Sequence, residues 1–429
     1  MKSSVQKIYQ ALLAMTLIMF ISSCEEDGGT NPGGPDEGDD VISGLITTNT
    51  TWETGKSYIL SGRVTVVDGV TLTIEPGVVL KAQLGEGANA SALLIAKGAT
   101  LNANGTSQLP IIFTTISDDI TPEDVATGNL SSPNLDATQG GLWGGLIILG
   151  NAPISDRNNA GSEQIEGIPP SDTNGLYGGP DANDNSGSIR YISIRHGGAN
   201  IGEGNELNGL TLGGVGAGTT IEYVEVIGNQ DDGIEWFGGT VNVNHAVVWN
   251  AGDDSYDTDQ AWDGTVNNFI AVLGPQSDHG MEIDGPEGSI NDGGVNKFEN
   301  GTIKSFVDAQ GGEYADLRSN AKATLNNIYF FDGKSNSDLE LDNNGVATNY
   351  LNSLINFTNL QFNESHQDTP RVIGDIVVEK TGDNETPLDV FTTRPLEASV
   401  VVTDTPTVGA TVAAFSGWTW VHQAGELEF

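Results

Sequence analysis

Four variants of one short apolar segment recur in this sequence: Thr220-Ile-Glu-Tyr-Val-Glu-Val226, Val241-Asn-Val-Asn-His-Ala-Val-Val248, Val266-Asn-Asn-Phe-Ile-Ala-Val272 and Leu325-Asn-Asn-Ile-Tyr-Phe-Phe331. Aligning Val226, Val248 and Val272 gives steps of 22 and 24 residues. Each segment is rich in β-branched and aromatic residues and is followed by Gly, Asn or Asp, a pattern that predicts strands and turns. A period in the low twenties is typical of stacked repeats.

Three repeat or sheet architectures are compatible with strands of this length. A leucine-rich repeat requires the pattern Leu-x-x-Leu-x-Leu-x-x-Asn, which these segments lack. A β-sandwich would show turns every ~8–12 residues with a clear alternation of apolar and polar side chains. The sequence therefore predicts an all-β protein, a right-handed parallel β-helix in which one coil stacks on the next and both ends are capped.

The N-terminal part of the predicted solenoid follows the same pattern. Gly69-Val-Thr-Leu-Thr-Ile-Glu-Pro-Gly77 and Pro110-Ile-Ile-Phe-Thr114 are similar to the first coils of secreted bacterial β-helix proteins. We expect Leu72, Ile74, Ile111 and Phe113 to fill the coil interior. Gly77 and Gly105 are expected at corners that require a positive φ.

The first 23 residues are those of a secretion signal. Lys2 and Lys7 precede an apolar run at residues 11–21, which is too short to span a bilayer comfortably. Ile21-Ser-Ser-Cys24 resembles the lipobox of bacterial lipoproteins, in which the cysteine thiol receives diacylglycerol. The alternative is an ordinary cleaved signal. Cys24 is the only cysteine of the chain, so a disulfide within it is excluded.

Four regions are predicted: the signal peptide at residues 1–23, a flexible acidic tether at 24–41, the β-helix at 42–381 and a C-terminal cap at 382–429. The acids that follow Cys24 resemble the surface-export signal of Bacteroidetes lipoproteins, although a plain spacer facing the periplasm has the same composition. We expect Trp418, Trp420 and Phe429 to cover the last coil.

The charge of the chain excludes several kinds of partner. Lys and Arg number 17 against 58 acids, a formal net charge of −41; loss of Lys2 and Lys7 with the signal leaves 15 basic residues and −43. Nucleic acid and anionic lipid headgroups are excluded, because both require clustered Lys and Arg. Divalent cations are favoured instead.

The densest polar region lies at residues 229–285 and contains Asn229-Gln-Asp-Asp-Gly233, Gly252-Asp-Asp-Ser-Tyr-Asp-Thr-Asp259 and Asp278-His-Gly280. Residues one period apart fall on the same face about 4.8 Å apart, so the acid pairs are expected to be neighbours. Stacked carboxylates repel one another unless a cation or a proton intervenes. The candidate Ca²⁺ ligands are Asp232, Asp253, Asp254, Asp257 and Asp259. Turns stabilised by Asp and Asn side chains are the alternative.

The order of these motifs also resembles family 28 glycoside hydrolases, the polygalacturonases. The resemblance places Asn229 with Asp231 or Asp232 in the first motif and Asp253 with Asp254 in the second; His279 and Arg318 belong to the third and fourth. It implies inverting hydrolysis with Asp253 or Asp254 as general acid. Gln230, Asp278 and Asn320 depart from the family pattern at a threonine, a glycine and a lysine position.

Aromatic residues lie beside these acids, namely Trp236, Trp249, Tyr256 and Trp262. Exposed rings at these positions would stack on sugar faces, whereas buried rings would be core or turn packing. The overall pattern resembles the β-helical outer-membrane lipoproteins of Bacteroidetes, which implies a fold and a location.

The predicted function is a surface-exposed lipoprotein that binds a glycan or an envelope protein, such as an outer-membrane transporter. The alternative is a polysaccharide hydrolase or lyase that uses the acidic face.

Overall fold

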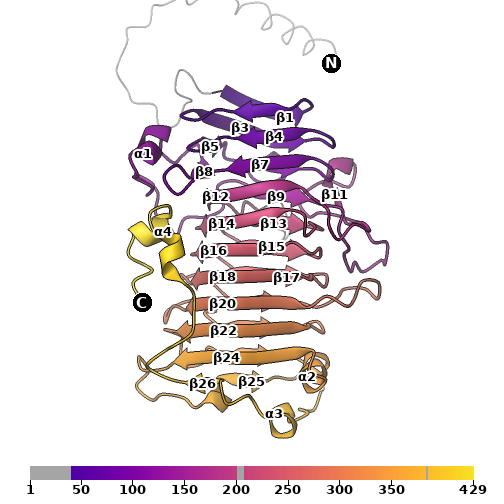
Figure 1. The fold of residues 1–429 in the computed structure, drawn as a ribbon, viewed down its shortest axis with the longest axis vertical. Helices are drawn as coiled ribbons and strands as arrows, with labels where there is room; N and C mark the ends of the chain where they lie inside the picture. The colour runs from indigo at the N-terminus through magenta and orange to yellow at the C-terminus, as the bar shows by residue number, and fades with distance from the viewer. Residues whose placement is uncertain (1–39, 201–206, 383–384) are drawn as a thin grey trace, which may run out of the picture. The chain divides into compact units, whose positions relative to one another are not determined.

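The computed structural model describes residues 40–200, 207–382 and 385–429. The signal peptide, Cys24 and most of the predicted tether lie outside these residues. Within them, 24 strands form a single sheet in which every pairing is parallel, and each strand pairs with strands one coil away (Figure 1). This arrangement is a right-handed parallel β-helix, so the predicted fold class is confirmed.

Each coil from β12 onward contributes one long and one short strand. The long strands stack in the order β12 (Gly187–Arg195), β14 (Thr220–Ile227), β16 (Val243–Trp249), β18 (Thr265–Val272), β20 (Asn296–Lys304), β22 (Ala323–Phe331), β24 (Ile355–Asn363) and β26 (Val401–Val402). The short strands stack in the order β6 (Ala92–Ile95), β9 (Leu146–Leu149), β13 (Leu210–Gly213), β15 (Ile234–Phe237), β17 (Tyr256–Asp259), β19 (Glu282–Ile283), β21 (Ala315–Leu317), β23 (Leu339–Leu341) and β25 (Val377–Glu379).

The first coils divide the long strand into two pieces. They comprise β1 (Asp40–Ile46), β2 (Thr50–Trp52), β3 (Ser57–Val66), β4 (Thr71–Ile74), β5 (Val79–Ala82), β7 (Thr100–Asn104) and β8 (Ile111–Thr115). Both β7 and β8 pair with β12, so β12 joins the two pieces. An antiparallel pair, β10 (Glu163–Gln164) and β11 (Leu176–Tyr177), belongs to the connection between β9 and β12.

Each long strand from β12 to β24 bends at one residue in the left-handed region. This corner column has φ between 50° and 59° and consists of Tyr191, Tyr223, His245, Asn268, Asn300, Asn327 and Asn359. Asn tolerates this conformation better than most residues. The larger members stack along the column, with ring centroids 4.3 Å apart for Tyr191 and Tyr223 and 4.4 Å apart for Tyr223 and His245.

The interior is filled by inward-facing apolar side chains of successive coils. Leu72, Ile74, Ile111 and Phe113 are all buried there, as predicted. The alignment of the repeats was wrong by one residue at one step. Val226 does pair with Val248, but Val248 pairs with Ala271, and Val272 lies beside Trp249.

The helices and 3-10 turns lie in connections and near the C-terminus. They are α1 (Pro122–Ala126), α2 (Asn344–Leu351), α3 (Val390–Thr393), α4 (Trp420–Gln423) and the turns η1 (Gly87–Asn89), η2 (Thr173–Gly175), η3 (Ile373–Asp375) and η4 (Val412–Phe415). Among the described residues, no helix has the length and apolar character needed to cross a membrane.

The C-terminal segment does not place its aromatic residues over the last coil, contrary to the prediction. After β26 the chain runs back along the long strands, so that α4 lies beside β14 and β16 (Figure 1). Trp418 packs edge-on against Tyr191 and Tyr223, and Trp420 packs against Trp249. These rings cover the apolar outer surface of the long strands.

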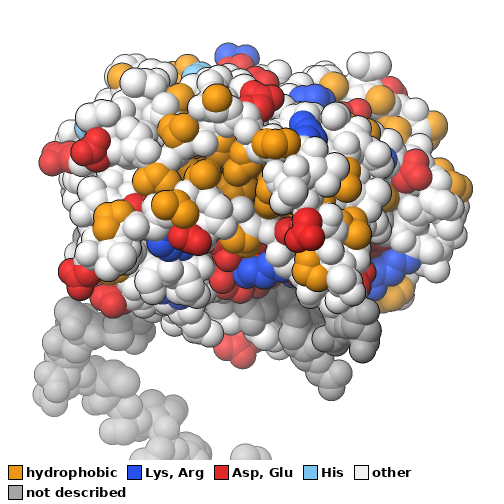
Figure 2. Space-filling view, turned by 90° about the horizontal axis from the view of Figure 1, so that it is seen from below, with side chains coloured by type: hydrophobic (Ala, Val, Ile, Leu, Met, Phe, Trp, Pro, Cys, Tyr) orange, Lys and Arg blue, Asp and Glu red, His pale blue; other side chains and the backbone are white. Residues whose placement is uncertain are grey.

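The C-terminal end of the coil stack is covered by residues of the last turns instead. Figure 2 views this end, where hydrophobic side chains gather in the middle of the face. Ile373, Phe391, Leu396 and Val402 are partly buried and pack against the interior core.

Candidate functional site

One acidic residue projects outward from each of five successive short strands. The equivalent position is occupied by Leu94, Ile147 and Thr211 in the three short strands before these acids. In the short strand after them it is occupied by Val378. We name the acids the carboxylate row: Glu235, Asp257, Glu282, Asp316 and Glu340. Parallel pairing places neighbouring members about 4.8 Å apart.

The surroundings change along this line of side chains. At its start Leu94 and Ile147 are buried against residues of the connection between β9 and β12, including Ile154 and Tyr177. Members of the carboxylate row are 6 to 8% exposed. They form the floor of an acidic strip, and more exposed charged side chains lie at its edges.

Burial and mutual repulsion shift the titration of the row. Burial first, and then the charge of Asp254, raises the pKa of Glu282 to about 9. Burial likewise raises the pKa of Asp316 to about 6 and that of Glu340 to about 7. The row therefore favours protons, hydrogen-bond donors or cations as neighbours.

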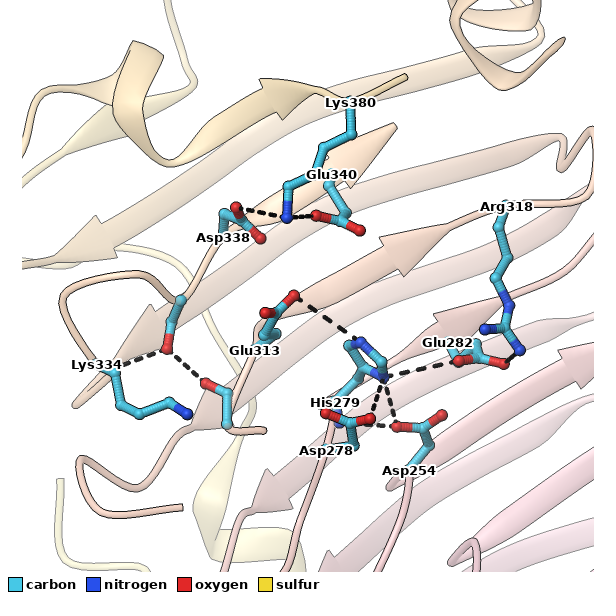
Figure 3. A network of polar contacts seen from close by, with 12 residues as sticks. Asp254, Asp278, His279, Glu282, Glu313, Arg318, Lys334, Asp338, Glu340 and Lys380 are labelled. Carbon is cyan, nitrogen blue, oxygen red and sulfur yellow. Dashed lines mark hydrogen bonds and ion pairs between the residues drawn. The ribbon is translucent and has the colours of Figure 1, made fainter. Parts of the chain in front are cut away.

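Two cationic side chains contact the row from its edge (Figure 3). The guanidinium of Arg318 bonds the carboxylate of Glu282, and its Nε donates to Asp284 Oδ1 at 3.0 Å. The ammonium of Lys380 contacts Glu340 and lies 3.2 Å from Asp338 Oδ2. Each cation thus neutralises two acids of the preceding coil.

A second line of polar groups runs along the turn that precedes each short strand. Asp232 Oδ1 accepts the backbone N–H of Asp254 at 2.9 Å. Asp254 Oδ1 in turn lies 2.7 Å from the backbone nitrogen of His279 and 2.8 Å from its Nδ1. Burial alone would lower the pKa of His279, but its bond to Asp254 and the surrounding acids raise it to about 10. The raised pKa favours the cationic imidazole, which lies among Asp254, Glu282 and Glu313 (Figure 3).

The predicted catalytic residues are brought together on four successive coils. Asp232 and Asp254 precede β15 and β17, His279 precedes β19 and Arg318 follows β21. His279 Nδ1 lies 3.7 Å from Glu282, which Arg318 also bonds. Asp254 and Asp232 are buried, and Asp253 is exposed at the turn.

Although Asp253 is exposed at the turn, neighbouring residues partly desolvate its carboxyl group, and this effect with the charge of Asp254 raises the pKa of Asp253 to about 6. Asp231, Asp232 and Asp253 bring one oxygen each within 4.8 Å of one another. Asn229 has a structural role, because its Nδ2 donates to the carbonyl oxygen of Asp232 at 2.7 Å.

The five predicted metal ligands do not form one site. The described acids, in one case together with His279, instead fall into several groups of three whose possible ligand atoms lie within 4.8 Å of one another. One contains Asp232 with Asp257, another contains Asp254 with His279, and Asp259 belongs to none of them.

Of the two alternatives for the aromatic rings beside the acids, stacking on sugars and core packing, three of the rings follow the second. Trp236, Tyr256 and Trp262 are fully buried and face the coil interior. Strand alternation turns Trp236 and Tyr256 away from the adjacent Glu235 and Asp257, whereas Trp262 lies in the turn after β17. Trp249 lies at the end of a long strand, half-buried beneath Trp420.

Most of the carboxylate row was missed from the sequence. A signal for it exists: each member stands alone between two inward-facing residues, as in Ile234-Glu-Trp236, Met281-Glu-Ile283 and Leu339-Glu-Leu341. An isolated acid in such a triplet is the outward position of a strand.

Comparison with known proteins adds one finding. Residues 44–390 match the family model described as a pectate-lyase like beta helix domain. No match was found among curated proteins or among solved structures.

Proposed function

Since this chain belongs to the family of pectate-lyase-like β-helix domains, we propose that it binds a polysaccharide along the carboxylate row. We further propose that a lipid on Cys24 holds it at the outer-membrane surface. The family fits a protein that acts on or binds polysaccharides. The observation that carries the proposal is the row itself, which offers one carboxylate per coil along five coils.

A linear neutral polysaccharide suits this surface best. Its hydroxyl groups donate hydrogen bonds, which carboxylates accept strongly. Because the acceptors recur at every coil, a polymer with a regular repeat engages several of them at once, and weak contacts combine into useful affinity. A formal charge of −43 after signal removal disfavours a polyanion.

The edges of the strip are accessible to such a polymer. Asp278 is 49% exposed, Arg318 41% and Lys380 43%. Asp253 is also exposed. These four side chains supply both acceptors and donors around a floor of less exposed carboxylates.

Binding is tested with the full-length protein and a panel of immobilised neutral and uronic polysaccharides. We expect retention on a neutral polymer and weaker retention on uronic ones. The double variant Asp253→Asn, Asp278→Asn should bind about tenfold more weakly or worse, because each change replaces a hydrogen bond to a charged group, worth about 1.5–3 kcal/mol, with one to a neutral group, worth about 0.5–1.5 kcal/mol.

The matched control is Asp119→Asn, Glu123→Gln, which removes two exposed acids between β8 and the end of α1. It should bind as the wild type does. Retention on no polymer, or an equal loss in both double variants, would contradict the proposal.

Hydrolysis is the second candidate, favoured by the hydrogen-bonded series Asp232, Asp254 and His279. Hydrolysis is tested with the same panel of polysaccharides by measuring the release of reducing sugar. Release that disappears in Asp254→Asn would assign an enzymatic role. Retention without release would leave binding as the function.

Anchoring is tested with Cys24→Ser. We expect this variant to leave the membrane fraction, and we expect added protease to digest the wild type on intact cells. A variant that stays in the membrane fraction, or a wild type that resists protease until cells are broken, would contradict the proposed location.

A further inference from the structure

A cleft lies at the ends of the long strands, away from the carboxylate row. It has a volume of about 470 Å³, and its lining includes Trp249 at the end of β16, Lys304 at the end of β20 and Glu426 of the C-terminal segment. Volumes of about 300–1,000 Å³ are typical of binding sites. None of the described residues that line the cleft belongs to the carboxylate row, so the cleft is separate from the proposed polysaccharide surface.

Large apolar side chains are exposed at this cleft. Phe306, which lies shortly after β20, is 36% exposed, and its neighbour Val307 is 48% exposed; both line the cleft. Phe429 is 44% exposed and packs against Phe331, which pairs with the cleft residue Lys304. Apolar side chains that gather at one exposed place mark interaction sites. They disfavour a sugar here, because its hydroxyl groups would lose water without gaining partners.

The charged groups around the cleft are mainly acidic. Of the described residues that line it, Lys304 alone is cationic, and its ammonium lies 2.8 Å from Oε2 of Glu426. Asp332, also in the lining, has 44% of its side chain exposed, and its only described ion-pair partner is His366, with Nδ1 at 4.0 Å. Asp308 follows the exposed apolar residues in the chain and is itself exposed. A cationic group of a ligand would therefore meet uncompensated carboxylate charge here.

The cleft is long enough for several residues of a peptide. Its lining runs from Trp249 in β16 through Val272 in β18 and Lys304 in β20 to Asp332, which follows β22. Neighbouring strands lie about 4.8 Å apart, so this line measures about 14 Å. A chain of about four residues in the extended conformation has that length.

We propose that this cleft binds an extended peptide segment of a partner protein, which inserts one large apolar side chain and places a Lys or Arg beside Asp332. Apolar anchors in pockets dominate the energetics of protein interfaces. A second copy of this chain and an anionic lipid surface both fit worse, because each would bring further negative charge to an acidic rim. The net charge of −41 also attracts a basic partner over long range and accelerates association.

The first experiment compares three labelled peptides with the full-length protein and no polysaccharide, at about 0.15 M salt, which screens long-range attraction. The first peptide is Gly-Lys-Leu-Phe-Lys-Gly. The second has Glu in place of both Lys, and the third has Ser in place of Leu and Phe. We expect the first to bind at least about tenfold more tightly than either of the others. Equal binding of the first and third would show attraction by net charge alone and would overturn the proposal, as would no binding of the first.

The second experiment compares two double variants of exposed apolar residues. Phe306→Ser, Val307→Ser should bind the first peptide about tenfold more weakly, because the apolar contact is lost. The matched control is Val372→Ser, Leu388→Ser, which changes residues that are 66% and 39% exposed and lie outside the cleft. It should bind as the wild type does. If the first variant does not fold, Val307→Ser alone replaces it. Equal affinities of the two variants for the peptide would refute the assignment.

The position of the bound peptide is measured with a photoreactive benzophenone in place of the phenyl ring of the first peptide. Cross-links identified by mass spectrometry should lie within residues 304–307 or at Trp249, which line the cleft. Cross-links confined to other residues would contradict this site even if the peptide binds.

Discussion

At the scale of single residues, some positions of the solenoid accept only glycine, because a neighbouring side chain or backbone atom lies too close for a Cβ atom. Gly301 in β20 pairs with Phe269 of β18. A Cβ atom on Gly301 would lie 2.1 Å from Cζ of that ring. Gly105 has a similar role: it was predicted at a corner with positive φ, but it is not among the glycines with positive φ. A Cβ atom there would lie 2.5 Å from the carbonyl oxygen of Tyr191.

Gly301→Ala should therefore destabilise the protein by about 1–3 kcal/mol, because overpacking a filled core forces side chains or backbone to shift. The measurement is the melting temperature. Gly293→Ala is the matched control, since no atom lies within 4 Å of the Cβ position of Gly293. Adding Phe269→Leu to Gly301→Ala should recover part of the loss. Equal melting temperatures for the two alanine variants would contradict this account of the core.

At the scale of elements, the short strands determine where acids can accumulate. A strand of three or four residues leaves one or two outward positions, so an acid there meets the equivalent acid of the next coil. Long strands use their outer surface differently. Val247, Ile270 and Val272 face outward and are buried beneath Phe415, Trp418 and Val421 of the C-terminal segment.

This segment also completes the environment of a buried ion pair. Arg195 and Glu225 are both fully buried, with Arg195 Nη2 3.8 Å from Glu225 Oε2. The backbone N–H of Val421 donates to Glu225 Oε1 at 3.0 Å, and Arg195 lies over the ring of Trp420. The segment therefore seals one side of the coils and leaves the acidic strip of the short strands uncovered by its rings.

At the scale of the whole molecule, the excess of acids over bases makes the stability of the folded protein depend on pH. Several carboxyl groups have pKa values raised above their ordinary ones: Asp253 and Asp316 to about 6, Glu313 and Glu340 to about 7, and Glu282 to about 9. At any pH between the ordinary pKa of one of these groups and its raised pKa, the folded protein therefore binds more protons than the unfolded chain. His279 acts in the same direction up to about pH 10.

With EDTA present, the melting temperature should fall as the pH rises from 5 to 9, because stability decreases with pH wherever the folded state binds more protons. The stabilisation is complete below the ordinary pKa values of the acids and is lost as each raised pKa is passed. The measurement is thermal unfolding at pH 5, 7 and 9. A melting temperature that is flat or rises over this range would show that these acids are not shifted as described.

Patterns among residues close together in the sequence were sufficient to predict the fold. Apolar strands, turn residues and a period near the length of one coil are all local, and they predicted both the β-helix and interior residues such as Leu72 and Phe113. The proximity of Asp232 to Asp254 was predicted from a spacing close to one coil, whereas His279 was grouped with them by the resemblance to polygalacturonases.

Tertiary structure alone decided which side chains face one another. Turn length varies from coil to coil, so the spacing between members of the carboxylate row changes and no fixed period reveals them. Strand alternation directs Trp236 and Tyr256 into the core, away from the adjacent acids. The position of Trp418 depends on contacts with Tyr191 and Tyr223, which lie more than 190 residues earlier in the chain. The sequence by itself determined the repeating coil, because that follows from local patterns. The register between coils and the path of the C-terminal segment depend on packing between distant residues, which only the folded chain brings together.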